Sequence, residues 1–530
     1  MPQRYNRLRI HPAAVLGILI CLGGSTVASV LTTPHAPAEP SPAPLAETIG
    51  ARFAEDSLGF ARLKGERIAL HPDLAAFYAA RGREPVWTDL ATRHTVLALL
   101  ADVAADGLDP APYRTAALAD LATADVQTGP DSLLADLDLL LTDAFVRAAE
   151  DLARPRADAS ELYGRRWHPH TRTVTPLAWL TEALANPNSA EAVSHAFNRA
   201  RPQHPEYQAL RGFLGRTLST IHDWPTLLPG RALIPADVSP RVVRLRERMH
   251  LEGYASPTLP DSLAWIYDDD LAAAVRTFQA HRDLDTTGVV DQATRAALND
   301  VPDDLIPLVQ LNLERWRWLP EDFGDFHVLV NLPTFELVVR EREGERTTEH
   351  LRMNVVVGRA NGWKTPVFSD TMTQVIFNPT WTIPASIQRE MYGEYRGQVV
   401  QEPGPRNPMR RVKFRFPNDM GIYIHDTTSR RSFTYEERDY SHGCIRAHDP
   451  QALAETILGR TNAWAPEDVA SIFSGPWRQR PEDLDTGVPV HLVYFTAWPT
   501  PEGGVQTFDD VYGYDAPLAE VLGLELDLGG

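Results

Sequence analysis

The stretch from residue 422 to residue 446 contains the residue types that nucleophilic acyl transfer requires. It ends in the run Ser441-His442-Gly443-Cys444-Ile445-Arg446. A thiol attacks a carbonyl carbon only as a thiolate, so it needs an imidazole to take its proton and return it to the leaving amine. His425, upstream of the run, and His442 both qualify by residue type. The pattern predicts a cysteine acyl-transfer site with Cys444 as the nucleophile.

The residues before His425 alternate in polarity as a β-strand requires. Ile422 and Ile424 are separated by Tyr423. An extended segment would place the two isoleucines on one face and the imidazole of His425 on the other. We therefore expect His425 at the end of a strand, available for chemistry.

The glycine before the cysteine predicts an unusual turn that exposes the thiol. The backbone amides of Gly443 and Cys444 are candidates for stabilising a tetrahedral oxyanion. Arg446 is a candidate for holding a carboxylate through a bidentate pair.

Cysteine usage supports a reactive thiol. The chain has two cysteines, Cys21 and Cys444, and Cys21 lies in an apolar N-terminal run. An unpaired thiol in the folded part of an exported protein is unusual, because oxidising compartments favour paired cysteines. The alternative is a buried, inert cysteine, since free cysteine is among the most buried residue types.

The N-terminus predicts export. Three arginines precede an uncharged, mostly apolar run over residues 13–31. The run is long enough for a membrane anchor, and Thr26-Val27-Ala28 offers a cleavage site for a signal peptide, so both interpretations stay open for residues 1–31. Residues 32–47 are rich in proline and alanine, and we expect them to form a linker.

Composition indicates a multidomain globular protein. The chain has 530 residues, of which 43% are hydrophobic and 23% charged, and at roughly 100 to 200 residues per domain it should contain about three units. A formal net charge of −19 argues against a nucleic-acid partner, because such partners require a basic face.

The expected fold class is α+β, in several domains. Helical spacing of apolar residues predicts an α-helical scaffold domain over residues 48–235 and a small unit with two readable helices over residues 239–302, of which the second has Asp291 as its N-cap; a resemblance described below implies a three-helix unit. From residue 305 to residue 500 the pattern changes to short strands, which predicts a mainly β catalytic domain followed by a C-terminal extension over residues 501–530.

The strands and the helix expected in the catalytic domain follow from alternation and capping. They are a hairpin of residues 327–332 and 335–339, strands at 353–357, 373–377, 412–416, 421–425 and 491–496, and a helix over 450–458 capped by Asp449.

The run from Ser441 to Arg446, preceded by Ile424-His425-Asp426-Thr427, resembles the motif of the L,D-transpeptidase (YkuD-type) domain. The resemblance extends to the large YcbB-like subfamily through the segments Phe77-Tyr78, Pro85-Val86-Trp87, Asn378-Pro379-Thr380-Trp381 and Pro403-Gly404-Pro405. The three-helix unit resembles the peptidoglycan-binding domain, through Gly253-Tyr254, Phe278-Gln279, Gly288 and Ala297-Leu298-Asn299.

The resemblance implies roles for these residues. Cys444 would be the nucleophile, His425 the general base and acid, His442 an assisting histidine, and the amides of Gly443 and Cys444 the oxyanion donors. The base would be oriented by a backbone carbonyl near Ser441 or Asp426 instead of by a carboxylate. The residues expected to contact substrate are Arg446, Ser441, Tyr423, Asn378 and Trp381. No cofactor and no metal are expected.

The implied activity is cross-linking of peptidoglycan in the periplasm or cell envelope. Stem peptides would serve as donor and acceptor, and carbapenems would inhibit. Alternatives are an L,D-carboxypeptidase or endopeptidase of the same fold, a zinc amidase with His425, His442 and Cys444 as ligands, and a non-catalytic wall-binding protein.

Two segments depart from the pattern of the subfamily. The expected capping segment, residues 388–402, is short, which bears on lid closure. Residues 407–411 carry Arg410 and Arg411 in place of small residues. These arginines would either contact substrate carboxylates or form a solvated charge run.

Overall fold

The computed structural model describes residues 42–55, 58–123, 130–170, 172–186, 189–220, 225–251, 253–254, 263–282, 284–299, 305–344, 346–501 and 503–526. The predicted signal segment, residues 1–31, lies outside this range, as does most of the predicted linker. Within the described residues, no helix is long and apolar enough to cross a membrane.

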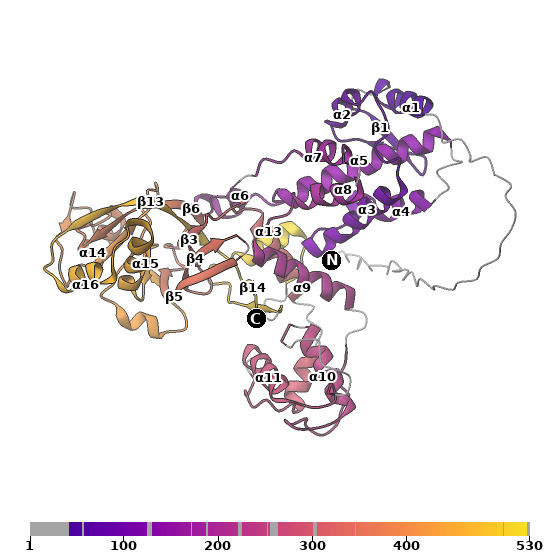
Figure 1. Ribbon diagram of the computed structural model, residues 1–530. Coiled ribbons are helices and arrows are strands. Elements are labelled where there is room, and N and C mark those ends of the chain that lie inside the picture. The colour runs from indigo at the N-terminus through magenta and orange to yellow at the C-terminus, as the bar shows by residue number, and fades with distance from the viewer. Residues whose placement is uncertain are drawn as a thin grey trace, which may run out of the picture. The chain divides into compact units, whose positions relative to one another are not determined.

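The N-terminal part is helical, as predicted, and it is drawn in indigo to magenta in Figure 1. Its helices are α1 (Pro42–Ala54), α2 (Leu74–Ala80), α3 (Leu90–Asp102), α4 (Thr115–Thr123), α5 (Asp131–Ala153), α6 (Ala159–Tyr163), α7 (Pro176–Leu184), α8 (Ser189–Asn198) and α9 (Pro205–Thr220), with 3-10 turns η1 (Val103–Asp106), η2 (Ala111–Tyr113) and η3 (Gly164–Arg166). Two expectations are corrected. Helix α1 begins inside the predicted linker, and a hairpin of β1 (Phe60–Leu63) and β2 (Glu66–Ala69) interrupts the helices.

The motif residues near position 80 are core residues of this helical domain. They surround Asp138, whose side chain is 4% exposed. Its carboxylate accepts hydrogen bonds from the Tyr78 hydroxyl at 2.6 Å and from the amides of Val86 and Trp87 at 2.8 Å each. Because a buried carboxylate is costly unless its oxygens are hydrogen-bonded, this contact fixes the loop between α2 and α3 onto α5.

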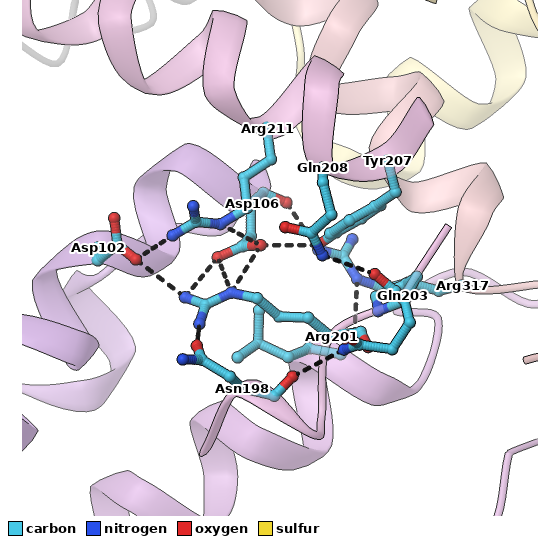
Figure 2. A network of polar contacts seen from close by, with 11 residues as sticks. Asp102, Asp106, Asn198, Arg201, Gln203, Tyr207, Gln208, Arg211 and Arg317 are labelled. Carbon is cyan, nitrogen blue, oxygen red and sulfur yellow. Dashed lines mark hydrogen bonds and ion pairs between the residues drawn. The ribbon is translucent and has the colours of Figure 1, made fainter. Parts of the chain in front are cut away.

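A second buried carboxylate, Asp106, joins the helical domain to the first helix of the catalytic domain (Figure 2). Asp106 is fully buried. It accepts from Arg201 Nε at 2.9 and 3.0 Å and from the Tyr207 hydroxyl at 2.8 Å. Its main-chain carbonyl accepts from Arg317 Nη2 at 2.6 Å. Arg317 directly follows α13 (Leu305–Trp316) and pairs with the buried Glu314 at 2.7 Å.

The three-helix unit forms as predicted, from α10 (Pro240–Leu251), α11 (Asp269–His281) and α12 (Gln292–Asn299). Asp291 caps α12 by accepting from the Thr294 amide at 2.8 Å. Gln279 of α11 accepts from the Gly288 amide at 2.8 Å. Gly288 has a φ of +71°, a conformation that glycine adopts without strain.

The catalytic domain is built on one large sheet. Among the described residues, its strand order is β11-β5-β12-β10-β9-β6-β13-β3-β4, and an additional β4–β5 pairing closes the sheet on itself. The strands are β3 (Phe326–Asn331), β4 (Glu336–Glu343), β5 (Arg346–Gly358), β6 (Phe368–Phe377), β9 (Val412–Arg415), β10 (Ile424–His425), β11 (Asp439–Ser441), β12 (Ile445–Ala447) and β13 (Arg480–Val493).

Most expected elements of this domain are confirmed. The hairpin is β3 and β4, which pair antiparallel, and Asp449 caps α15 (Pro450–Asn462) through the Ala452 amide at 3.0 Å. The remaining elements are β7 (Trp381–Thr382) paired with β8 (Val400–Gln401), α14 (Ala385–Tyr392), the 3-10 turn η5 (Arg430–Thr434) and α16 (Pro466–Ser474). Strand β13 begins before the expected 491–496 and ends within it.

The predicted C-terminal extension belongs to the catalytic domain instead. Strand β15 (Val505–Thr507) pairs with β14 (Ala497–Pro499), and α17 (Asp515–Leu522) follows. Tyr512, 3% exposed, donates from its hydroxyl to the carbonyl of Gly358 at the end of β5, at 2.7 Å. Asp515 pairs with the buried Arg315 of α13 at 2.7 Å. These contacts place the segment in the core that supports the site.

Candidate active site

The register of three strands gathers polar side chains on one face of the sheet. Strand β10 pairs parallel with β12 and antiparallel with β9. Ile424 lies opposite Phe414 and Ile445, and all three are fully buried in the core. His425 lies opposite Lys413 and Arg446. Since successive residues of a strand point to opposite faces, the expected separation of isoleucine and histidine is confirmed.

Cys444 occupies a tight turn between β11 and β12. Gly443 has a φ of +105°, so a side chain at this position would strain the backbone. The Ser441 hydroxyl accepts from the Gly443 amide at 3.1 Å and donates to the Cys444 carbonyl at 2.5 Å. The Thr365 hydroxyl donates to the Gly443 carbonyl at 2.8 Å. These contacts fix the turn and leave the thiol partly exposed.

The two predicted oxyanion donors differ in their hydrogen bonding. The Gly443 amide is engaged by Ser441. The amide of Cys444 has no acceptor among the residues that the structure describes. The Cys444 amide is therefore unengaged within the described residues, whereas the Gly443 amide is bound to Ser441, and the role of either amide as an oxyanion donor stays a prediction.

The backbone carbonyl that orients His425 is that of Asp426. Nδ1 of His425 donates to this oxygen at 2.5 Å, and within the described residues Nε2 makes no hydrogen bond. The Asp426 carboxylate accepts from the amides of Arg411 and Thr427, at 3.1 and 2.6 Å, and pairs with Arg430. Asp426 thus holds the imidazole through its main chain, while its carboxylate anchors the surrounding loop.

Burial governs the protonation of the imidazole and of the thiol. Burial, reinforced by the nearby charge of Arg446, lowers the pKa of His425 to about 3. Burial raises the pKa of Cys444, although contacts with Tyr423, Lys413 and Arg446 oppose this rise. Both groups are therefore neutral at pH 7, which is the state required for general-base activation of the thiol.

The thiol does not hydrogen-bond to His425 in this structure. Sγ of Cys444 donates to the Gly421 carbonyl at 3.6 Å. The Tyr423 hydroxyl also lies within hydrogen-bonding reach of the thiol, and Trp381 interacts with the same hydroxyl.

Lys413 also belongs to the polar side chains around the Cys444 thiol. Its Nζ lies 3.7 Å from the centroid of the Tyr423 ring, and burial lowers its pKa. The sequence motif did not point to Lys413. Strand alternation could have found it, since it belongs to a strand next to that of His425.

The imidazole of His442 is bound to a carboxylate and is not free to act as a base. Nε2 of His442 donates to Glu390 of α14 at 2.9 Å, and the ring packs edge to face on Trp363, with centroids 4.8 Å apart. Arg359, which follows β5, donates to the same carboxylate at 3.2 and 3.4 Å. No sequence pattern indicated Glu390, Arg359 or Trp363 as neighbours of the nucleophile.

Two residues expected to bind substrate are internal instead. Ser441 is 1% exposed and its hydroxyl serves the turn. Asn378 is also 1% exposed; its amide donates to the Arg478 carbonyl at 3.1 Å, and its oxygen accepts from Arg411 at 2.9 Å. Both side chains thus have internal partners, and their contact with substrate stays a prediction. Arg446, Tyr423 and Trp381 are partly exposed beside the thiol, which is compatible with substrate contact.

Arg411 is partly buried and does not belong to a solvated charge run; together with Arg410 it lines a cavity beside Asp426, so its contact with substrate stays a prediction. Its guanidinium lies 3.6 Å from the centroid of Trp477, and burial lowers its pKa. Among the described residues, no group of three or more histidine, cysteine, aspartate or glutamate side chains could hold a metal ion. His425, His442 and Cys444 thus do not converge as zinc ligands.

Comparison with protein families identifies three domains. Residues 325–488 match the YkuD family, described as an L,D-transpeptidase catalytic domain. Residues 239–298 match a family described as "Putative peptidoglycan binding domain", and residues 72–214 match one described as "Scaffold domain".

One curated relative is a "Putative L,D-transpeptidase" of Haemophilus influenzae, 26% identical over 251 residues, which are 40% of this chain and 49% of the relative. The chain thus spans about half the length of that relative. Two solved structures give TM-scores of 0.15, too low to support an argument: an L,D-transpeptidase fragment from Xylanimonas cellulosilytica and a fused amidase and peptidoglycan-binding protein from Clostridium acetobutylicum. Each matches 50% of this chain, at 15% and 12% identity, and 98% and 100% of its own chain respectively.

Proposed function

We propose that this chain, which carries an L,D-transpeptidase catalytic domain, cross-links peptidoglycan between the third-position diamino acids of two stem peptides. The reaction would pass through a thioester on Cys444 and release D-alanine. The observation that carries the proposal is the shared sheet face. Cys444 directly precedes β12, whose residues pair with the strand that holds His425, and Nε2 of that imidazole is unengaged within the described residues.

The first half-reaction acylates the thiol. Cys444 transfers its proton to Nε2 of His425 and attacks the carbonyl carbon of the third residue of a tetrapeptide stem. The Cys444 amide is placed to stabilise the oxyanion. The bond to the terminal D-alanine then breaks, and the imidazolium returns the proton to the leaving amine. Arg446 and Lys413 provide positive charge beside the thiolate.

The second half-reaction transfers the acyl group. The side-chain amine of the diamino acid in another stem attacks the thioester, His425 takes the proton of that amine, and the thiol of Cys444 is regenerated. The cross-link joins the two third residues. No cofactor takes part in either step.

The domain composition supports action in the cell envelope. A peptidoglycan-binding domain would hold the enzyme on its polymeric substrate, and the N-terminal sequence predicts export to the periplasm, with residues 13–31 as a signal peptide or anchor. Because carbapenems are acylating agents, we expect them to modify Cys444.

A second candidate is an L,D-carboxypeptidase or endopeptidase of the same fold, in which water resolves the thioester. The partial exposure of Cys444 favours keeping this alternative, because water can reach the thiol. A wall-binding module without catalysis would leave the unengaged imidazole and the fixed turn without a purpose.

Product analysis tests these functions. A disaccharide tetrapeptide is incubated with the full chain and with the Cys444→Ala variant, and the products are identified by mass spectrometry. Cross-linked dimers that lack one D-alanine and are absent with the variant support the transpeptidase. Tripeptide monomers alone would assign a carboxypeptidase, and identical products with both proteins would indicate a binding module.

A further inference from the structure

A carboxylate of the protein itself lies in a basic site beside the nucleophile. Glu390 of α14 accepts from Nε2 of His442 at 2.9 Å and from Nη2 of Arg359 at 3.2 and 3.4 Å. His442 is two positions from Cys444 in sequence, and the Arg359 amide donates to the Ser441 carbonyl of the same turn at 3.0 Å. The Glu390 carboxylate therefore lies against the turn that holds the thiol.

Arg359 has a hydrogen-bond donor that Glu390 does not engage. Its Nη2 donates to Glu390, whereas its Nε is buried and makes no hydrogen bond within the described residues. The charge of Arg359 also acts on Arg446, whose pKa is lowered first by burial and then by this repulsion. A guanidinium can bind a carboxylate through a bidentate pair. The site therefore has the chemistry to bind a carboxylate other than that of Glu390.

The segment that carries Glu390 is built as a separate small unit. The Gln388 amide donates to the carbonyls of Ile383 and Gly397, at 2.9 Å each, and its oxygen accepts from the Arg396 amide at 2.9 Å. The eight-residue helix α14 ends at Gly393, which has a φ of +78°. The Glu390 side chain is 44% exposed. Its ion pairs with His442 and Arg359 can break without disturbing the bonds inside the segment.

We propose that Arg359 and His442 form a binding site for a carboxylate of the stem peptide, and that Glu390 occupies this site until substrate displaces it. The inference rests on the proposed function, because it assigns part of the substrate to these residues. No covalent step is involved. Two carboxylates lie on the residues that flank the attacked bond and are the ligands proposed here: that of the terminal D-alanine and that of the side chain of a third-position diaminopimelate.

Binding measurements on the full chain carrying Cys444→Ala test the proposal without turnover. Dissociation constants are measured by titration calorimetry for three ligands: a disaccharide tetrapeptide with all carboxylates free, the same compound with the terminal carboxylate amidated, and one with the diamino acid carboxylate amidated. The added substitutions are Glu390→Gln, Arg359→Gln and the control Glu394→Gln. Glu394 lies on the same segment and pairs with Arg396 only, among the described residues.

We expect Glu390→Gln to tighten binding of the free acid, because an internal competitor is removed, by roughly tenfold if it occupies the site nine-tenths of the time. Arg359→Gln should weaken binding of the free acid about tenfold, which is the loss of one charge-assisted pair. Arg359→Gln should not change the dissociation constant of one of the two amidated ligands. The carboxylate that is amidated in that ligand is the one that Arg359 binds. Glu394→Gln should match the parent.

Weaker or unchanged binding with Glu390→Gln would overturn the proposal, as would an equal effect of Arg359→Gln on all three ligands. Both results differ from a failure of the proposed function. If the proposed function is wrong, the protein with its native Cys444 will not convert the free acid at all.

Discussion

Nδ1 of His425 donates to the main-chain carbonyl of its own neighbour, Asp426, at 2.5 Å, while the Asp426 carboxylate serves Arg411, Thr427 and Arg430. The carboxyl group adjacent to the histidine in sequence is therefore not a third catalytic member. The hydrogen bond to this backbone carbonyl keeps the proton of His425 on Nδ1 and leaves the lone pair on Nε2 free. No side-chain substitution at position 426 removes the carbonyl.

Asp426→Asn should therefore cost less than roughly tenfold in kcat/KM, whereas loss of a carboxylate that orients a catalytic histidine directly costs about 10⁴ in rate. His425→Asn removes the base and should cost at least about 10². Steady-state rates of D-alanine release for both variants check this. A loss with Asp426→Asn as large as that with His425→Asn would contradict the assignment of the carbonyl.

The pH dependence of activity should lack an acidic limb near the ordinary histidine value of 6.5. The base must be neutral to accept the thiol proton, and with a pKa of about 3 His425 is neutral throughout the range above pH 4. The kcat/KM of the folded enzyme should stay level from pH 7 to pH 5. A fall centred near pH 6.5, in protein shown by circular dichroism to be folded, would contradict the lowered pKa.

The same pKa shift links pH to stability. His425 and His491 titrate at about 3 and 4 when folded, below their ordinary value of 6.5. The unfolded chain therefore binds more protons below pH 6.5, and the free energy of unfolding must fall as the pH drops from 6.5 toward 4. Urea midpoints at pH 7 and pH 5 should differ less for His491→Asn than for the parent. An unchanged difference would contradict the contribution of His491.

Lys413 should assist ionisation of the thiol. Its positive charge lowers the pKa of Cys444 against the dominant effect of burial. Lys413→Met removes that charge and should slow alkylation of Cys444 by iodoacetamide at pH 8 about threefold to tenfold, because the thiolate is the reactive form. Arg415→Met, on the same strand, is the control, since Arg415 is not among the main contributors to the pKa of the thiol. Equal rates for Lys413→Met and the parent would exclude this role.

The buried Asp106 network should contribute substantially to stability (Figure 2). Asp106→Asn leaves Arg201 and Arg317 buried beside an uncharged group and should lower the free energy of unfolding by about 3–5 kcal/mol. Asp102 pairs with Arg201 and with Arg211, which also donates to Asp106 at 3.1 Å, but the Asp102 side chain is 45% exposed, so Asp102→Asn should cost at most about 1 kcal/mol. Urea unfolding of both variants measures the difference, and equal costs would contradict it.

Local sequence patterns were sufficient to predict the parts of the site that lie within one segment. The alternation around Ile424 determined which face carries His425, and Gly443 indicated the turn at the nucleophile, because both depend on neighbouring residues only. The caps at Asp291 and Asp449 were predicted for the same reason.

Contacts between distant segments could not be predicted. Glu390 lies 52 residues from His442 in sequence, and nothing in the residue types around either one indicates their pairing. Ser441 and Asn378 were expected to contact substrate because they occur in motif segments, yet their hydroxyl and amide satisfy buried backbone groups. Tyr512 lies in a polar segment, and its burial depends on Gly358 of β5 and on Tyr494, whose hydroxyl accepts from the Tyr512 amide at 2.8 Å.

A thioester on Cys444 can be detected by intact-mass spectrometry of the enzyme quenched with acid during turnover of a disaccharide tetrapeptide. We expect a covalent adduct equal to the substrate minus D-alanine, labile to hydroxylamine as a thioester is, located on the peptide containing Cys444 and absent in Cys444→Ala. Release of D-alanine by Cys444→Ala at the rate of the parent, or sustained turnover by the parent while Cys444 remains open to alkylation without any adduct, would contradict it.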